Sequence, residues 1–272
     1  MSGQQDEPAP PLDSDEGLAL RFAERHDGEF RYVPDLGRWF VWTGQVWERD
    51  GTLAGIRAAR AICREASAKS NGRERKQLAS AQTVAAVERL AKADERIVAT
   101  TDLWDADPWA LNTPSGVVDL STGQLREHRP DDFMTKITAV APGGKCPLWL
   151  GFLDRVMDGD RELITYLQRL AGYALTGLTR EQMFGFAHGT GGNGKGVFFN
   201  TLAGIMADYH TVLPIEAITM SRNERHPTEL AMLHGARLVT AQETEAGRRL
   251  AQSRINCGSA CKKDPVSGVI GV

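Results

Sequence analysis

The feature that most constrains this chain is a glycine-rich segment between a short apolar run and a helical pattern. Residues 189–196 read Gly-Thr-Gly-Gly-Asn-Gly-Lys-Gly. Residues 183–188 before this segment have strand character, and apolar residues recur at helical spacing from Val197 to Met206 after it. Strand, glycine loop and helix, in this order, form the context that a phosphate-binding loop requires. The segment therefore predicts an α/β fold with a nucleotide site at the loop.

Each part of the loop has a predicted role. Glycines let consecutive N–H groups face one anion, and the helix that follows adds the positive end of its dipole. Lys195 is expected to bind the β- and γ-phosphates of ATP as a point charge. The residues predicted to hold the nucleotide are Gly189, Thr190, Gly191, Gly192, Asn193, Gly194, Lys195 and Gly196. The alternative is a flexible glycine turn that joins a strand to a helix.

The loop departs from the full motif at one position. The pattern G-x-x-x-x-G-K-[ST] is met at Gly189, Gly194 and Lys195, but Gly196 stands where a Ser or Thr hydroxyl normally coordinates Mg²⁺. The ion is then expected to rest on water, nucleotide oxygens and a distant acidic residue.

An apolar run farther along the chain ends in acidic residues. Residues 236–241 have strand character, and Glu243 and Glu245 follow them. In a P-loop fold an acid at the end of a neighbouring strand holds Mg²⁺ through water and polarises the attacking water. Glu243 is the first candidate for both tasks and Glu245 the second. The alternative is an ordinary strand end with solvated glutamates.

Composition bounds the class of protein. The 272 residues suffice for one large or two ordinary domains, and the formal net charge is −3. Residues 51–100 hold ten Lys and Arg against five Asp and Glu, which indicates either a DNA-tracking face or a solvated helix surface. No apolar run reaches membrane-spanning length and no signal sequence is visible, so we expect a cytoplasmic protein without membrane partners. Four scattered cysteines do not predict disulfides or a zinc site.

The first half of the chain predicts a separate domain. An acidic, Pro-rich tail over residues 1–15 is expected to be disordered, and a short helix follows from Glu16. Residues 31–48 predict a hairpin at Thr43-Gly44, whose three tryptophans form either a stacking platform for bases or a core. The remaining expected elements are two helices over 51–98 broken near residues 71–72, short strands over 102–140, a linker at 142–144, and helices at 148–157 and 160–177.

Together these blocks resemble a known family. Residues 112–123, residues 189–200 and residues 237–250 are similar to the phage and plasmid primase-helicase proteins. Those proteins carry a superfamily 3 helicase domain behind a poxvirus-type N-terminal helper domain, and the three blocks resemble the helper-domain signature, the Walker A segment and the Walker B segment. The resemblance implies an AAA+-like P-loop NTPase core, incomplete at its C-terminal end, preceded by a mixed α+β domain. The domains it implies are a tail at 1–15, a helicase-associated domain at 16–140, a partial ATPase domain at 145–255 and an atypical tail at 256–272.

The function that the resemblance implies is ATP-driven DNA unwinding. The resemblance also implies Mg²⁺ as a cofactor, single-stranded or forked DNA as a partner, a ring of six subunits, and a primase or replication-initiation partner. Beyond Ile255 the family pattern continues into a Thr-Gly-Gly-Asp block, a sensor strand and an arginine finger, which residues 256–272 do not resemble. We therefore expect a truncated or frameshifted product that binds ATP with impaired turnover, and its status as an enzyme stays open. The alternatives are a non-catalytic DNA- or protein-interaction module or an inactive prophage remnant and, last, a small-molecule kinase.

Overall fold

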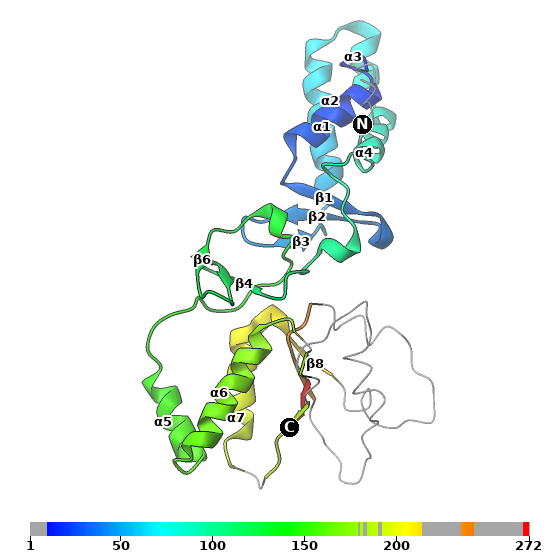
Figure 1. Cartoon of the computed structure of the whole chain (residues 1–272). Coiled ribbons are helices and arrows are strands. Elements are labelled where there is room, and N and C mark those ends of the chain that lie inside the picture. Colours follow the sequence, from blue (N-terminus) through cyan, green and yellow to red (C-terminus); the bar gives the residue numbers. More distant parts are fainter. Residues whose placement is uncertain are drawn as a thin grey trace, which may run out of the picture. The chain divides into compact units, whose positions relative to one another are not determined.

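The computed structural model describes residues 10–178, 180–181, 184–189, 192–213, 235–241 and 269–271. Within these residues the chain is mixed α/β, with helices and three small sheets (Figure 1). The chain divides into two compact units. The first comprises Met1–Trp104 and Pro130–Phe133, and the second comprises Asp105–Arg129 and Met134–Val272.

The first unit combines helices with an antiparallel sheet of order β1-β2-β3. Its helices are α1 (Asp15–Arg25), α2 (Ala54–Lys69), α3 (Gly72–Leu78) and α4 (Ala81–Ala91), and its strands are β1 (Phe30–Val33), β2 (Arg38–Trp42) and β3 (Trp47–Arg49). The predicted hairpin is confirmed, because Trp42 pairs with Trp47 across the turn.

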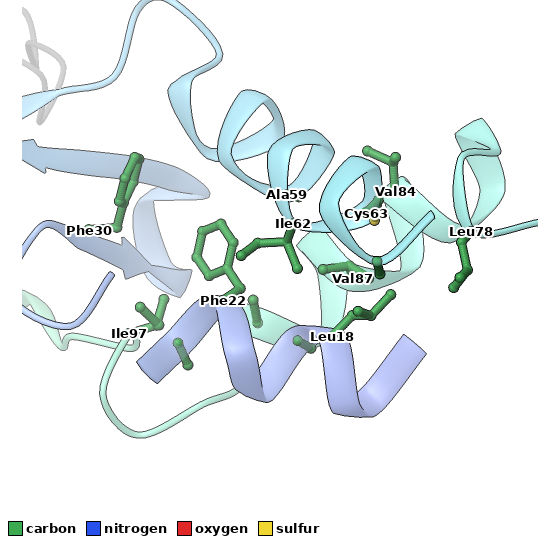
Figure 2. Packing of buried hydrophobic residues seen from close by; sticks show 14 of the residues in the cluster. Leu18, Phe22, Phe30, Ala59, Ile62, Cys63, Leu78, Val84, Val87 and Ile97 are labelled. Atoms are coloured by element: carbon green, nitrogen blue, oxygen red, sulfur yellow. The ribbon is translucent and has the colours of Figure 1, made fainter. Parts of the chain in front are cut away.

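Helical periodicity explains the core of this unit. Leu18 and Phe22, four residues apart on α1, are fully buried, and so is Ile62 on α2. Figure 2 shows these side chains pointing into the space between the helices. Phe22 also meets the rings of Phe30 and Trp39, with centroids 5.9 and 5.8 Å away. The core is thus continuous from the helices to the sheet.

The predicted helix break near residues 71–72 is confirmed, but the prediction of one helix after it is wrong. α3 ends at Leu78, and Ser80 caps a separate α4 by accepting a hydrogen bond from the Thr83 N–H (3.2 Å). The Ser80 hydroxyl satisfies an amide that an uninterrupted helix would pair with its own backbone.

The tryptophans belong to the core. Trp39 and Trp47 are 9% and 1% exposed, and Trp42 is partly buried beside Trp47. Trp47 also packs on Trp104, and the Arg31 guanidinium lies 5.3 Å from the Trp47 ring centroid. The core interpretation is confirmed for Trp39 and Trp47, and Trp42 packs against the cluster that contains Trp47 while remaining partly exposed.

The start of α2 depends on one carboxylate. Asp50 Oδ2 accepts from the Ala54 N–H (2.6 Å), and Oδ1 accepts from the Thr52 N–H (2.7 Å). Leu53 at the helix N-cap position has a φ of 60° and gives no side-chain cap. Asp50 therefore supplies the cap from four residues upstream.

Replacing Asp50 by alanine should destabilise the protein by about 1 kcal/mol, the usual cost of a lost N-cap. Burial alone raises the pKa of Asp50, but the hydrogen bonds from Thr52, Gly55 and Ala54 outweigh it and lower the pKa below its usual value. The stabilisation is therefore present above the unfolded pKa of about 3.9 and is lost as the pH falls through the lower folded pKa.

Urea unfolding of wild type and Asp50→Ala at pH 7 and pH 3 measures this effect. The difference between the two proteins should be smaller at pH 3, because below about 3.9 the unfolded chain takes up a proton at Asp50 and the contribution of the charged cap declines. Glu48→Ala removes an exposed carboxylate from neighbouring β3 and should change stability little. An Asp50→Ala penalty as large at pH 3 as at pH 7 would contradict the assignment.

In its described residues, the second unit contains an antiparallel sheet, a parallel sheet and three α-helices. The antiparallel strands are β4 (Ala110–Thr113), β5 (Gly116–Asp119) and β6 (Leu125–Arg126). The parallel sheet has the order β7-β10-β9-β8, with β7 (Phe184–Phe186), β8 (His210–Val212), β9 (Leu238–Ala241) and β10 (Val269–Gly271). The helices are α5 (Pro147–Val156), α6 (Arg161–Leu175) and α7 (Lys195–Met206).

The helices of this unit begin where the sequence predicts. Asp160 caps α6 by accepting from the N–H groups of Glu162 and Leu163, both at 3.0 Å. The predicted helix at 148–157 is α5, and the helical pattern after the glycine loop is α7. Pairs of stacked rings link α5 to α7, since Trp149 stacks on Phe152 and on Phe198.

The two compact units divide the chain at residues 104 and 105, and the predicted domain bounds at residues 140 and 145 stay a prediction. Residues 105–129 group with the parallel sheet, because backbone and side-chain hydrogen bonds join them to it. The Asn112 N–H donates to Tyr209 Oη (3.1 Å) just before β8, and the Arg237 guanidinium just before β9 donates to the Ala110 carbonyl (2.7 Å). Among the described residues, no helix has the length and apolar character needed to cross a membrane.

Candidate functional site

The glycine loop lies between a parallel strand and a helix. β7 ends at Phe186 and α7 begins at Lys195, and between them the structure describes residues 187–189 and 192–194. Gly192 and Gly194 have φ angles of 78° and 86°, in the region that favours glycine. The predicted loop residues Thr190 and Gly191 lie outside the described residues.

Gly194 is required for a second reason, which is close packing on α5. A Cβ atom at this position would lie 2.7 Å from Val156 Cγ1 and 3.2 Å from Phe152 Cζ. The loop therefore rests on α5, whose aromatic residues also pack against α7. Because Trp149 of α5 stacks on Phe198 of α7, the helix on which the loop rests also packs against the helix that follows the loop.

Lys195 reaches back across the loop. Its Nζ donates to the Gly189 carbonyl (2.9 Å) and to Asn193 Oδ1 (3.0 Å), and Asn193 Oδ1 also receives the Lys195 N–H at 3.5 Å. The ammonium is thus bound to two oxygens of the glycine segment, at the start of α7. This position combines a positive charge with the start of a helix.

The N-terminus of α7 is open to a ligand. Gly194 is the N-cap residue and gives no side-chain cap, and the Lys195 N–H makes only the 3.5 Å bond to Asn193, so the amides of the first turn of α7 can bind an anion. Gly196 has no atom within 4 Å of the Cβ position that a larger residue would occupy. Glycine is therefore not demanded there by packing.

Of the segment that contains the second predicted set of site residues, the structure describes only the strand that precedes them. β9 ends at Ala241, and Glu243 and Glu245 lie outside the described residues. Ala241 pairs with Gly271 of β10, and Gly271 pairs with Phe186 of β7. The carboxyl ends of β7 and β9 therefore lie level at one edge of the sheet, about 10 Å apart across one intervening strand. In the described part of the chain, no group of three His, Cys, Asp or Glu side chains could hold a metal ion.

A buried arginine at the other end of β9 was not predicted. Arg237 is 4% exposed, and its guanidinium donates to the carbonyls of Leu175 (2.7 Å), Ala110 (2.7 Å) and Asp107 (3.2 Å). Burial lowers the pKa of Arg237 from its usual high value. These contacts join α6, the segment before β4, and β4 to the strand that leads toward the predicted acids.

Tyr209 packs beside this arginine and completes the junction. Its ring centroid lies 4.5 Å from Arg237 Cζ, and its hydroxyl accepts from the Asn112 N–H. Burial raises the pKa of Tyr209 to about 12, so the phenol stays neutral. An arginine before an apolar strand is the only sequence signal for this junction, and that signal is weak.

The comparison with protein families bears on the first half of the chain. Residues 19–158 match the profile of the family described as D5 N terminal like, which is the N-terminal region of phage and plasmid primase-helicase-like proteins. The match covers just over half of the chain. The chain belongs to the D5 N-terminal-like family. Membership connects it with DNA replication. A comparison with curated proteins found no match.

The D5 N-terminal-like region spans parts of both units. It begins in α1 and ends just beyond α5, so it includes the strand pair β4–β5 and the helix on which the glycine loop rests. The loop itself and the parallel sheet lie beyond the matched residues. Their function is therefore argued from geometry.

Proposed function

We propose that the chain is the ATP-binding part of a phage- or plasmid-type replication helicase of superfamily 3, with its nucleotide at the glycine loop. The observation that carries the proposal is the Lys195 ammonium, held over the loop by Gly189 and Asn193 at the first residue of α7. A phosphate chain would displace these two oxygen partners and take the ammonium and the free amides of α7 in their place.

The parallel sheet supports this placement. In open α/β sheets, ligands bind outside the carboxyl ends of the strands, and the loop follows the carboxyl end of β7. The level ends of β7 and β9 bring the chain after Ala241 to the same edge. Glu243, and Glu245 as the second choice, are proposed to orient the attacking water.

Magnesium fits the described residues only in part. Lys195 and the loop amides suit the phosphates, but Gly196 offers no side-chain oxygen to the ion. Mg²⁺ supplies charge neutralisation in phosphoryl transfer. No described residue offers the ion a side-chain ligand, and Glu243 is the residue proposed to hold it.

The family suggests what ATP would drive. Hydrolysis is proposed to power DNA unwinding by a ring of six subunits that binds single-stranded or forked DNA, together with a primase or initiation partner. Phosphoryl transfer depends mostly on positioning and electrostatics, so turnover requires groups beyond the loop. Binding of ATP is therefore the first property to test.

Titration of the full chain with a fluorescent ATP analogue, with Mg²⁺ and with EDTA, tests the proposal. We expect binding in both conditions and only a small gain from Mg²⁺. Gly196→Ser should enlarge the gain from Mg²⁺ by about tenfold, or about 1.4 kcal/mol, because it restores the hydroxyl ligand in open space.

Gly204→Ser is the matched control for this variant. It makes the same substitution on the same helix, also at an open and exposed position, but at the end remote from the loop. It should leave the Mg²⁺ effect unchanged. If the wild-type chain bound no nucleotide in either condition, the ATP proposal would fail and the interaction-module interpretation would replace it.

A further inference from the structure

We propose that the outer face of α2 binds the phosphate backbone of nucleic acid without sequence preference. The face consists of Arg57, Arg60 and Arg64, and we call it the α2 arginine face. The proposal goes beyond the nucleotide site, since it lies in the first unit and needs neither ATP nor the glycine loop. Its choice of partner rests on the replication role proposed above.

Helix geometry places the three arginines together. Residues three, four and seven apart share one face of a helix, and Arg57 and Arg64 differ by only about 20° in direction. They span about 10 Å along the axis. The opposite face of α2 is buried, with Ala59, Ile62 and Cys63 at 0% exposure. The arginine face is therefore directed to solvent.

In the described residues, the acidic side chains of the first unit form no ion pairs with these arginines. No ion pair in the described residues involves Arg60 or Arg64, and Arg57 donates only to the Thr52 hydroxyl (3.0 Å). The one acid of α2, Glu65, lies on a different flank. Both of its oxygens accept from Arg25 of α1, at 2.7 and 2.8 Å.

The surrounding charge has the same sign. Residues 57–76, which cover most of α2 and α3, contain seven Lys and Arg but only two Asp and Glu. All seven basic residues are exposed. The whole chain carries a net charge of −3, so this segment is a local exception and not an overall bias. A local positive field of this kind steers polyanions.

The chemistry favours phosphates over other anionic partners. Three arginines rather than lysines present planar forks that match phosphate oxygens in pairs. The other side chains on this face, Ala61 and Ala68, are small and leave the backbone of a nucleic acid room to approach. A lipid surface would call for aromatic or leucine side chains among the arginines, whereas the exposed Leu53 and Ile56 both precede Arg57 at the start of α2.

The tryptophans decide between phosphate and base contacts. Trp39, Trp47 and Trp104 are all at most 9% exposed and Trp42 is partly buried beside Trp47, so the described part of this unit has no fully exposed tryptophan on which bases could stack. Recognition through phosphates alone positions a nucleic acid but reads no sequence. We therefore expect binding that is strongly salt-dependent and indifferent to sequence.

Fluorescence anisotropy with the full chain tests the proposal, in the absence of nucleotide and at several salt concentrations. The probes are a labelled single strand and a labelled duplex, each in two unrelated sequences. Arg57→Ala/Arg60→Ala/Arg64→Ala should weaken binding at least tenfold at about 0.1 M salt. It should also flatten the plot of log affinity against log salt by about 2–3 units, because three phosphate contacts are lost.

The matched control removes the same charge elsewhere in the unit. Arg38→Ala/Arg49→Ala/Arg89→Ala takes three exposed arginines from β2, β3 and α4 and should change the affinity less than about threefold. A triple change to lysine on the α2 face keeps the charge and should keep the salt slope. Circular dichroism should show the same secondary structure for all variants, since all six arginines are exposed.

Three results would overturn the inference. They are equal losses in the two alanine triples, no binding of DNA by the wild-type chain, and equally tight binding of polyglutamate of matched charge. Lys195→Ala should retain full DNA affinity in this assay. A failure of the ATP proposal is thus distinguishable from a failure of the α2 arginine face.

Discussion

Replacing Arg237 by alanine is expected to destabilise the second unit more than any surface change in the chain. The guanidinium fills the hydrogen-bonding needs of the Leu175, Ala110 and Asp107 carbonyls. Buried polar groups left unpaired cost about 1–3 kcal/mol each, so we expect a loss of about 3 kcal/mol or more. For a unit of this size, 3 kcal/mol corresponds to a fall of about 6–12 °C in Tm.

Thermal unfolding followed by circular dichroism measures the loss, and hydrogen exchange locates it. Exchange should rise in β4 and β9, which the arginine joins, while α1 and α2 keep their protection. Arg169→Ala, which removes an exposed arginine from α6, should shift Tm by no more than 1–2 °C. Arg237→Lys should recover only part of the loss, because one ammonium lacks the planar fork that reaches three carbonyls.

An Arg237→Ala protein with wild-type Tm and exchange would contradict this account. The result would mean that the three carbonyls find other partners at little cost. The same variant also tests whether residues 105–129 fold together with the parallel sheet. If β4 and β9 lose protection together, residues 105–129 fold with the parallel sheet.

Lys195→Ala is expected to weaken ATP binding by about 10- to 100-fold. The estimate follows from the loss of a charge-assisted hydrogen bond, worth about 1.5–3 kcal/mol, between the ammonium and a phosphate. Folding should be little affected, because the bonds that Nζ makes to Gly189 and Asn193 lie at an exposed loop. The measurement is a titration with a fluorescent ATP analogue, beside a thermal melt of the same sample.

Two further variants sharpen this test. Lys145→Ala removes an exposed lysine from the segment before α5 and should bind ATP like wild type. Lys195→Arg keeps the charge but changes its shape, and should fall between wild type and alanine. Unchanged affinity in Lys195→Ala, with an intact fold, would remove the glycine loop from the nucleotide site.

Several elements could be predicted because their signals are local. Asp160 and a stripe of apolar residues predict helix α6, and the helical spacing of apolar residues after the loop predicts α7. The hairpin at Thr43-Gly44 follows from turn chemistry between two β-prone runs. The split between α3 and α4 was missed, since Ser80 is tolerated within a helix as well as at its start.

For the candidate site too, some parts could be predicted from local sequence signals and other parts could not. The loop glycines and Lys195 form one continuous motif, so their roles could be read along the chain. The predicted pairing of this loop with Glu243 and Glu245 depends on the path of the chain after Ala241, and it stays a prediction. The excess of basic residues over residues 51–100 is also visible in the sequence. Its interpretation depends on which side of α2 is buried, and only the structure shows that side.

By itself the sequence determined the α/β class, the glycine loop between strand and helix, the position of Lys195, and the resemblance that the D5 N-terminal-like match supports in part. These are properties of neighbouring residues, which short-range sterics and periodicity govern. Only the tertiary structure decided that Asp50 caps α2 past Leu53, that Gly194 must be small because Val156 lies against it, and that Arg237 joins three segments. Arg237 and Ala110 are 127 positions apart. Long-range contacts of this kind are selected by which surfaces remain to be buried and which carbonyls remain to be paired, and no local pattern encodes that choice.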